Sequence, residues 1–346
     1  MKIERLELNE LDNFINFHSQ AYPKHFNYRQ RFQFQFLDNP YLLDKKQPFI
    51  FIALDKNKKI VGQYGVNPLV YNFGGKEVHC FCGCDLFVYE QYRKYGAGGL
   101  LSIKAINSCQ PHFSIGISAE ARPLLDSLHM EKIGEVHVFL WLKNMFVVSK
   151  GLWYLLTKKK IKAPHHEPFL FPADLSWGGY NFSLLSALND YSPPLGDKDI
   201  LQFSRSSSFL RWRFFTRPGY YFYKLGSEQS SAYFVVKIIN WKNMHLLALI
   251  DFNLGGHDLS LFKALINSVK RLAKMTNSDG IITMSSHKFP DQEFKKEFFL
   301  RIGAPFEIMA NATFPFTTEQ IKKRDVAFIT MADSDLEFAF WSKDNG

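Results

Sequence analysis

The sequence predicts an α/β (α+β) protein made of two similar halves in tandem. Strand-like and helix-like runs alternate along the chain, and the same order of runs occurs twice. In the first half, a loop rich in glycine and basic residues joins a strand to a helix. The length of 346 residues favours two domains, and a hydrophobic content of 46% is enough for a sizeable core in each.

The first half has the order strand, strand, strand, loop, helix, strand, helix, strand. A polar turn at 55–59 separates the first two strands, and Gly74-Gly75 is a hairpin signal before the third. The expected strands are 49–54, 60–66 with an extension over 69–73, 76–88, 112–118 and 136–142, and the expected helices are 100–106 and 121–132.

The loop at 93–99, with the sequence RKYGAGG, has the composition of an anion site. A helix N-terminus leaves about four backbone N–H groups unpaired and carries a partial positive charge, so it suits phosphate. The glycines let a pyrophosphate approach the backbone, and Arg93 and Lys94 add positive charge. The spacing matches neither the loop of nucleoside triphosphate-binding folds nor the G-x-G-x-x-G of dinucleotide folds.

The pattern Arg93-x-x-Gly96-x-Gly98 resembles the acyl-CoA pyrophosphate loop of the GNAT superfamily of N-acyltransferases. The order of elements over about residues 1–145 is also similar to that family, and residues 131–134 resemble the end of its last core helix. The resemblance implies a mixed, mostly antiparallel central sheet flanked by helices, and acyl-CoA as co-substrate. The coenzyme A contacts that it implies are Leu86, Phe87, Val88, Arg93, Lys94, Tyr95, Gly96, Ala97, Gly98 and Gly99.

The second half repeats this order, which predicts two tandem GNAT-like domains. The segment 210–218 resembles 32–40, and Arg301-Ile302-Gly303 resembles Lys132-Ile133-Gly134. The expected strands of the second half are 220–225, 232–240, 246–252, 280–285 and 308–314, and the expected helices are 259–275 and 291–302.

The loop of the second half, at 253–258, differs from the first where charge matters. It has no arginine, and Asp258 places a negative charge where a helix begins, which suits an N-cap and repels phosphate. We therefore expect three parts: a GNAT-like domain at 1–150 that binds acyl-CoA, a proline-punctuated connection at 151–200, and a second GNAT-like domain at 201–346. The second domain contributes to the acceptor pocket or is purely structural.

Acyl transfer from a thioester to an amine needs alignment and a hydrogen-bond donor for the developing oxyanion. The resemblance implies that this donor is a backbone N–H on the third strand, and Leu86 is our candidate. Asp85 is a candidate general base, with substrate orientation or capping of a bulge as the alternative. Many family members place an acidic tyrosine where this chain has Met130, beside His129, so the sequence offers no dedicated general acid.

The acceptor is inferred from the tandem arrangement and from segments that mix aromatic and basic residues. These resemble bacterial surface-polysaccharide acyltransferases that act on nucleotide-linked amino sugars, such as a dTDP-3-amino-3,6-dideoxyhexose receiving acetyl or 3-hydroxybutanoyl. The candidate acceptor contacts are Tyr22, His25, Ser118, Arg211 and Trp212. The alternative for the last two places Trp212 in the core, with Arg211 and Arg213 on the opposite face.

The net charge of +9 fits phosphate-bearing substrates. Cys80, Cys82 and Cys84 are expected to be buried thiols, and no metal-ligand spacing is present. The N-terminus lacks the apolar run of a signal peptide, so we expect a cytoplasmic protein with no integral membrane segment. Two other functions remain open: a Fem-type peptidyltransferase that uses aminoacyl-tRNA, and a non-catalytic binding module in polysaccharide assembly.

Overall fold

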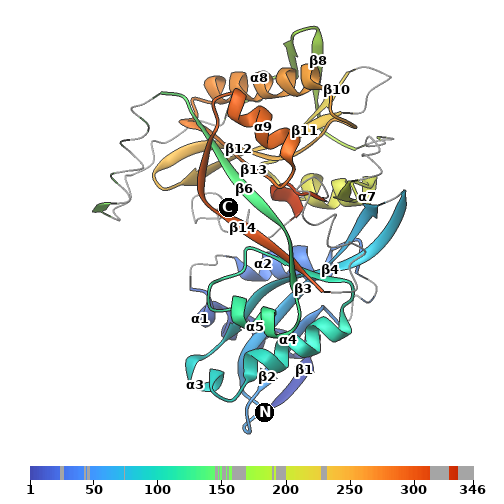
Figure 1. The fold of residues 1–346 in the computed structure, drawn as a ribbon, viewed down its shortest axis with the longest axis vertical. Coiled ribbons are helices and arrows are strands. Elements are labelled where there is room, and N and C mark those ends of the chain that lie inside the picture. Colours follow the sequence, from blue (N-terminus) through green and yellow to red (C-terminus); the bar gives the residue numbers. More distant parts are fainter. Residues whose placement is uncertain are drawn as a thin grey trace. The chain divides into compact units, whose positions relative to one another are not determined.

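A computed structural model describes residues 1–23, 27–42, 44, 47–73, 75–144, 147, 149, 153, 156–157, 169–188, 191, 200–226, 232–311 and 327–333. The chain divides into two compact units (Figure 1). Unit 1 comprises residues 1–135 and 306–324, and unit 2 comprises residues 136–305 and 325–346.

The sheet of unit 1 has the strand order β1-β2-β3-β4-β5-β14. Neighbouring strands are antiparallel except β4 and β5, which are parallel. Its strands are β1 (Lys2–Arg5), β2 (Ile50–Leu54), β3 (Ile60–Phe73), β4 (Lys76–Val88), β5 (His112–Ile115) and the C-terminal part of β14 (Leu300–Ala310). Its helices are η1 (Leu8–Glu10), α1 (Leu11–Ala21), α2 (Tyr28–Phe32), the π-helix η2 (Gln33–Leu37), α3 (Glu90–Arg93), α4 (Ala97–Ser108) and α5 (Arg122–Ser127).

Helices cover both faces of this sheet, because successive strand residues point to opposite sides. On one face, Phe51 and Ala53 of β2 pack in one cluster with Leu101 of α4. On the other face, Ile50 and Ile52 pack with residues of α1 and α2. The strand β2 is therefore buried along its whole length, and the sheet is a rigid platform for the end of β4.

The sheet of unit 2 has the order β6-β13-β12-β11-β10-β8-β7. Only β12 and β13 run parallel among these neighbours. Its strands are β6 (Glu131–Leu142), β7 (Asp174–Trp177), β8 (Tyr180–Leu185), β10 (Tyr221–Leu225), β11 (Tyr233–Trp241), β12 (Met244–Asn253) and β13 (Gly280–Ser285). The other elements are β9 (Leu201–Phe203), which pairs in parallel with β15 (Ala327–Phe328), α7 (Ser207–Leu210), the π-helix η3 (Arg211–Phe215), α8 (Leu259–Met275), α9 (Lys288–Lys296) and η4 (Met331–Asp333).

The core of unit 2 lies between its sheet and the amphipathic helix α8. Leu265 and Val269 of α8 are fully buried in the same cluster as Leu247 and Leu249 of β12. All but one of the residues of β12 are buried, as expected for a strand covered on both faces.

The predicted fold class is confirmed, and β4, α8 and β13 have the predicted bounds. The predicted C-terminal ends of the helices 121–132 and 291–302 are wrong. The observed helices end at Ser127 and Lys296 and are followed by the strands β6 and β14, which are longer than expected. His129 and Phe298 adopt left-handed φ angles of 56° and 64° just after these helices. No glycine marks either turn in the sequence, so the end of each helix was missed. Residues 131–134 consequently lie in a strand and not at the end of a helix.

The two units also differ from the ranges 1–150, 151–200 and 201–346. Most of β6 belongs to unit 2, and residues 306–310 of β14 belong to unit 1. The expected connection includes β7 and β8, which extend the sheet of unit 2. The internal repeat is visible in local structure, because the π-helices at 33–37 and 211–215 occur where the two similar segments align.

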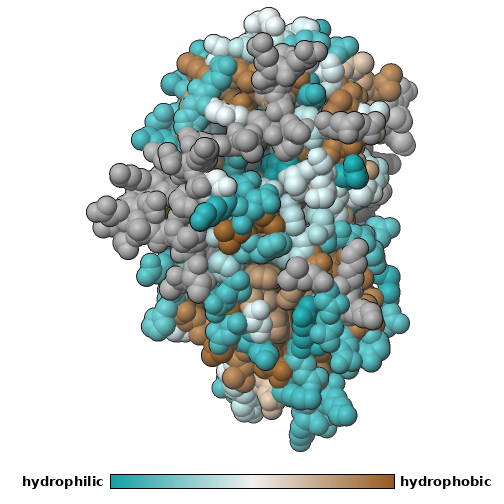
Figure 2. Space-filling model, turned by 90° about the vertical axis from the view of Figure 1, so that its right-hand side faces the viewer, coloured by the Kyte–Doolittle hydropathy of each residue, from teal (hydrophilic) through white to brown (hydrophobic). Residues whose placement is uncertain are grey.

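The described cysteines at 80, 82, 84 and 109 are buried free thiols, as expected. Along the described part of the chain, no helix is both long enough and apolar enough to cross a membrane. Hydrophilic residues cover much of the face in Figure 2, with smaller hydrophobic patches between them.

Candidate active site

The strands β4 and β5 pair over only three residues, and β4 continues beyond them. The last parallel pair joins Gly83 to Ser114, whereas β4 extends to Val88. The last five residues of β4 are therefore beyond the ladder with β5. An opening of this kind between two parallel strands exposes backbone that can bind an extended ligand.

A bulge lies in this continuation of β4. The β3–β4 register shifts between Gln63 and Gly65, so neither Asp85 nor Leu86 has a partner in that register. Asp85 has a left-handed φ of 51°, which is uncommon for a residue with a Cβ. Bulges redirect backbone groups and often lie beside functional sites, and this one turns the backbone at the end of the ladder.

Two side chains hold the bulge in place. The guanidinium Nη2 of Arg31 donates to Oδ2 of Asp85 at 2.8 Å, with both side chains at most 7% exposed. The amide Nε2 of Gln63 donates to the backbone oxygen of Asp85 at 3.0 Å. A buried ion pair and a hydrogen bond from an amide side chain thus hold Asp85 in its strained conformation. Sequence reasoning missed Arg31 and Gln63, since they lie 54 and 22 residues from Asp85 along the chain.

An aromatic group from α1 and α2 packs behind the same bulge. The hydroxyl of Tyr22 donates to the backbone oxygen of Leu86 at 3.3 Å. Its ring lies 4.8 Å from that of His18, which stacks on Tyr28 with centroids 3.2 Å apart. Burial raises the pKa of Tyr28 well above its usual value, so its hydroxyl stays protonated. Among the predicted acceptor contacts that the structure describes, Tyr22 has a hydrogen bond to the bulge.

The loop after β4 leads into the N-terminus of α4. Gly96 is the N-cap, with a left-handed φ of 73° that glycine adopts without strain. No side chain caps this helix end, so its first-turn N–H groups face the loop without a side-chain acceptor. A Cβ added at Gly98 would lie 3.6 Å from Leu124, an ordinary contact, so packing alone does not require glycine there.

Basic side chains border this helix end. Arg93 is exposed, and its Nε donates to the backbone oxygen of Val88 at 3.0 Å. Exposed Lys94 lies beside Tyr95, with Nζ 5.2 Å from the ring centroid. The donor groups present, backbone N–H and two cations, fit the diphosphate of coenzyme A. Among the described residues, no cluster of His, Cys, Asp or Glu could hold a metal ion.

The other predicted acceptor contacts are Ser118, Trp212, Arg211 and His25. Ser118 accepts the N–H of Ala121 through Oγ at 3.2 Å and so forms the turn before α5. Trp212 is 8% exposed and packs on Phe209, a placement that favours its core alternative. Arg211 is exposed. His25 lies outside the described residues.

Arg213 is buried and donates to the backbone oxygen of Ala332, so it does not share the exposure of Arg211.

Met130 and His129 lie where the resemblance implies a general acid. Met130 is 3% exposed in a small apolar cluster, and His129 beside it is exposed. Met130 has no ionisable proton and His129 is exposed, so neither is a buried acid.

The loop of unit 2 uses its helix N-terminus differently. Oδ1 of Asp258 accepts the N–H of Leu261 at 3.0 Å and caps α8. Oδ1 of Asn253 accepts the N–H of Gly255 at 2.9 Å. In unit 2, side chains therefore accept hydrogen bonds from backbone N–H groups of the loop and of the first turn of α8. The start of α4 in unit 1 has no side-chain cap. The predicted N-cap is confirmed.

Comparison with known proteins identifies the fold. Residues 2–121 match the family model described as an acetyltransferase (GNAT) domain. A GCN5-related N-acetyltransferase from Anabaena variabilis has a TM-score of 0.56 and 13% identity, with 90% of this chain and 72% of that chain covered. A conserved protein from Enterococcus faecalis, described as a probable N-acyltransferase, has a TM-score of 0.54 and 12% identity over 89% and 71%.

Saccharomyces cerevisiae N-myristoyltransferase with bound myristoyl-CoA also has a similar fold, with a TM-score of 0.51 and 13% identity over 89% of this chain and 80% of that chain. No match was found among curated protein sequences. At these identities the solved structures establish the fold. The domain match together with this fold supports an enzyme of the acyl-CoA-dependent N-acyltransferase class.

Proposed function

We propose that the chain transfers an acyl group from acyl-CoA to the amino group of a nucleotide-linked amino sugar, at a site in unit 1. The observation that carries the proposal is the continuation of β4 past its last pair with β5 into an uncapped helix N-terminus. The edge of β4 at Phe87 and Val88 lies beyond the ladder with β5 and suits the amide groups of the pantetheine arm, and the backbone oxygen of Val88 accepts from Nε of Arg93. Arg93, Lys94 and the first turn of α4 would hold the diphosphate.

The reaction needs alignment more than covalent help from the protein. The neutral amine attacks the thioester carbonyl, a C–N bond forms, and the C–S bond then breaks to release the thiolate. The backbone N–H of Leu86 is the proposed donor to the oxyanion, because the bulge takes this residue out of the β3–β4 ladder. The proton of the nascent ammonium passes to the thiolate or to water. The position at which many family members have a tyrosine holds Met130, which has no ionisable group.

Asp85 is better suited to hold the bulge than to accept the proton. Its carboxylate oxygen Oδ2 already accepts a charge-assisted hydrogen bond from buried Arg31. The amine of an amino sugar has a lowered basicity, so a strong base is not required. Tyr22, beside Leu86, is the proposed contact on the acceptor side.

Replacing Arg93 with Glu tests the coenzyme site. A charged group that donates hydrogen bonds to a phosphate contributes about 1.5–3 kcal/mol, so KM for acyl-CoA should rise roughly 10- to 100-fold with little change in kcat. Acyl transfer to a panel of amino acceptors is measured with acetyl-CoA and 3-hydroxybutanoyl-CoA, and coenzyme A binding is measured by calorimetry. The panel includes dTDP-linked amino sugars and free amino sugars.

Arg271 is the matched control, because it is an exposed arginine on α8. Arg271→Glu changes the net charge by the same amount and should leave KM unchanged. An Arg93→Glu enzyme with normal coenzyme A affinity would disprove the assignment of the loop. A normal loop with activity on free sugars or peptides alone would retain the acyltransferase and remove the nucleotide-linked acceptor.

A further inference from the structure

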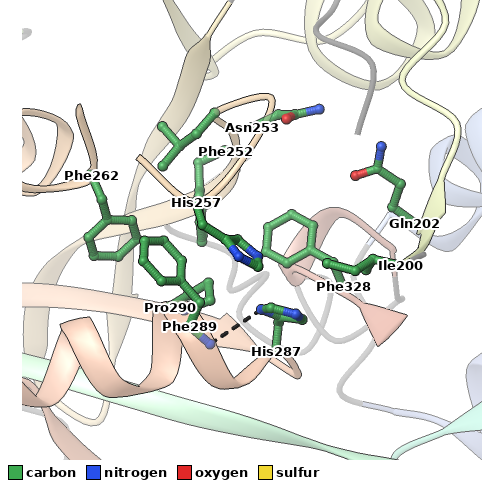
Figure 3. Close-up of a pocket in the computed structure, with 12 residues that line it drawn as sticks. Ile200, Gln202, Phe252, Asn253, His257, Phe262, His287, Phe289, Pro290 and Phe328 are labelled. Carbon is green, nitrogen blue, oxygen red and sulfur yellow. Dashed lines mark hydrogen bonds between the residues drawn. The ribbon is translucent and has the colours of Figure 1, made fainter. Parts of the chain in front are cut away.

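Unit 2 contains a pocket at the place where its own two parallel strands separate. The last β12–β13 pair joins Leu249 to Thr283, and β12 continues to Asn253. Residues from the end of β12, from the loop before α8 and from the start of α9 line the pocket, together with residues of β9 and β15 (Figure 3). The space between these residues amounts to about 470 Å³ when the part open to solvent is counted.

Half of the residues that line the pocket carry aromatic rings. They are Phe252, Phe262, Phe289, Phe328, His257 and His287. The ring of His257 stacks on that of Phe289, with centroids 4.9 Å apart and an interplanar angle of 22°. It also lies 5.3 Å from the ring of His287. Figure 3 places His257 at the centre of this group, with the two imidazoles close together. A further planar ring could extend such a stack.

Polar groups with both donors and acceptors lie among these rings. Gln202 is half-buried and contributes a whole amide, and Figure 3 shows it on the same side of the view as the amide of Asn253. Nδ1 of buried His287 accepts the N–H of Phe289 at 3.3 Å. In the neutral ring this bond assigns the proton to Nε2, and that atom is buried.

Charge distinguishes this pocket from a coenzyme site. None of the described residues that line it is Lys, Arg, Asp or Glu. Asp258, at the adjoining helix N-terminus, caps α8 and places a negative charge beside the loop. A diphosphate would therefore meet an occupied helix end and no fixed cation. A ring that carries polar edges but no charge matches the walls better.

We propose that this pocket binds a planar heteroaromatic ring with the chemistry of a nucleobase. Stacking on the aromatic wall is the main source of affinity, and the amide of half-buried Gln202 pairs with the polar edge of the ring. An aliphatic acyl chain would neither stack on these rings nor pair with the Gln202 amide. The site stands on unit 2 alone and is independent of acyl transfer in unit 1.

Saturation-transfer NMR on the full chain with thymidine and with adenosine tests this inference. Ribose, which lacks the base, and cyclohexanol, which is an apolar ring without aromatic faces, are the comparison ligands. At least one nucleoside should bind, and both comparison ligands should fail to bind. His257→Ala should weaken nucleoside binding roughly tenfold, since one stacking partner is worth about 1–3 kcal/mol. His257 is exposed, so this variant should fold normally, and its thermal unfolding is recorded beside the wild type.

His79→Ala is the matched control, because His79 is an exposed histidine on β4 whose ring contacts Tyr41. It should bind nucleosides as the wild type does, and so should Arg93→Glu. The inference is overturned if neither nucleoside binds, if cyclohexanol binds equally well, or if His257→Ala has no effect. Loss of nucleoside binding in Arg93→Glu would also overturn it. Acyl transfer is measured separately, so failure here leaves the proposed activity testable.

Discussion

The two halves of the chain build the same strand–loop–helix connection and use the helix N-terminus in opposite ways. In unit 1, Gly96 opens α4 without a side-chain cap, and Arg93 and Lys94 lie next to it. In unit 2, Asp258 caps α8 through its own carboxylate. A side chain at the N-cap competes with a ligand for the N–H groups of a helix N-terminus, so the N-cap residue is one of the factors that make the site available for an anion.

The same contrast extends to the point where the parallel strands separate. In unit 1 the last pair ends at Ser114, whose Oγ lies 3.3 Å from the hydroxyl of Tyr64. In unit 2 the last pair ends at Thr283, whose hydroxyl donates to the backbone oxygen of Leu249 at 2.9 Å. Equivalent positions are therefore satisfied by a side-chain network in one half and by the local backbone in the other.

Each half also buries an arginine against an aspartate of its third strand, and the variants Arg31→Met and Arg205→Met compare the two. Arg31 forms an ion pair with Asp85, whereas Arg205 bonds to both Asp251 and Asp333. Removing one partner of a buried pair costs about 3–5 kcal/mol. We expect a loss of that size for Arg31→Met and a larger loss for Arg205→Met, which leaves two buried carboxylates. Urea unfolding measures both losses.

Neutralising the carboxylates distinguishes charge from packing. Arg205→Met combined with Asp251→Asn and Asp333→Asn should recover part of the lost free energy of unfolding, because no unpaired charge remains. Should Arg205→Met prove no less stable than Arg31→Met, the larger network of unit 2 is not the stronger constraint. The comparison of the two halves would then rest on their loops alone.

A titratable group distinguishes the strand junction of unit 1 from that of unit 2. Nε2 of His112 lies 3.0 Å from the hydroxyl of Tyr64, and burial lowers the pKa of His112 to about 4. Because the unfolded pKa is about 6.5, stability from this residue is complete above pH 6.5 and is lost as the pH falls towards 4. The loss is on the order of 3 kcal/mol. Urea unfolding of wild type and His112→Gln at pH 7 and pH 4.5 measures it.

Glutamine keeps a polar group for Tyr64 but does not titrate in this range. The variant should therefore lose less stability than the wild type between these two pH values, even if it is less stable at pH 7. Equal losses would show that carboxylates elsewhere account for the acid sensitivity. Thr283 at the corresponding junction has no ionisable group, so no matching effect is expected from that junction.

Local signals in the sequence predicted the framework of both halves. Asp258 marks the start of α8, and long apolar runs mark β4 and β13, so these elements were predicted at their observed bounds. The helix ends near His129 and Phe298 were missed, because their left-handed turns carry no glycine. Most of β6 belongs to unit 2, and the C-terminal end of β14 belongs to unit 1. This assignment depends on pairing between strands that are far apart in the sequence, which the periodicity of apolar residues does not encode.

The sequence predicts the loop of the candidate site, but not the side chains that hold the bulge of β4 in place. Residues 93–99 carry glycine and positive charge in consecutive positions, and such a pattern is visible without a structure. The ion pair of Arg31 with Asp85 depends on a bulge that rotates one residue out of the ladder. The sequence offered the core position of Trp212 as an alternative but not the burial of Arg213, which lies in a π-helix, where the extra residue per turn shifts which side chains face inwards.

The smallest expected effect concerns the cap that distinguishes the two helix ends. Asp258→Ala removes the acceptor of the Leu261 N–H and the negative charge beside the helix dipole, which should cost about 1 kcal/mol. Asp258→Ser restores an acceptor and should regain most of that free energy in thermal or urea unfolding. Neither variant should bind coenzyme A by calorimetry, since the loop at 253–258 still lacks an arginine. Coenzyme A binding at unit 2 in Asp258→Ala would show that the cap alone separates the two loops, and that the cations of unit 1 are dispensable.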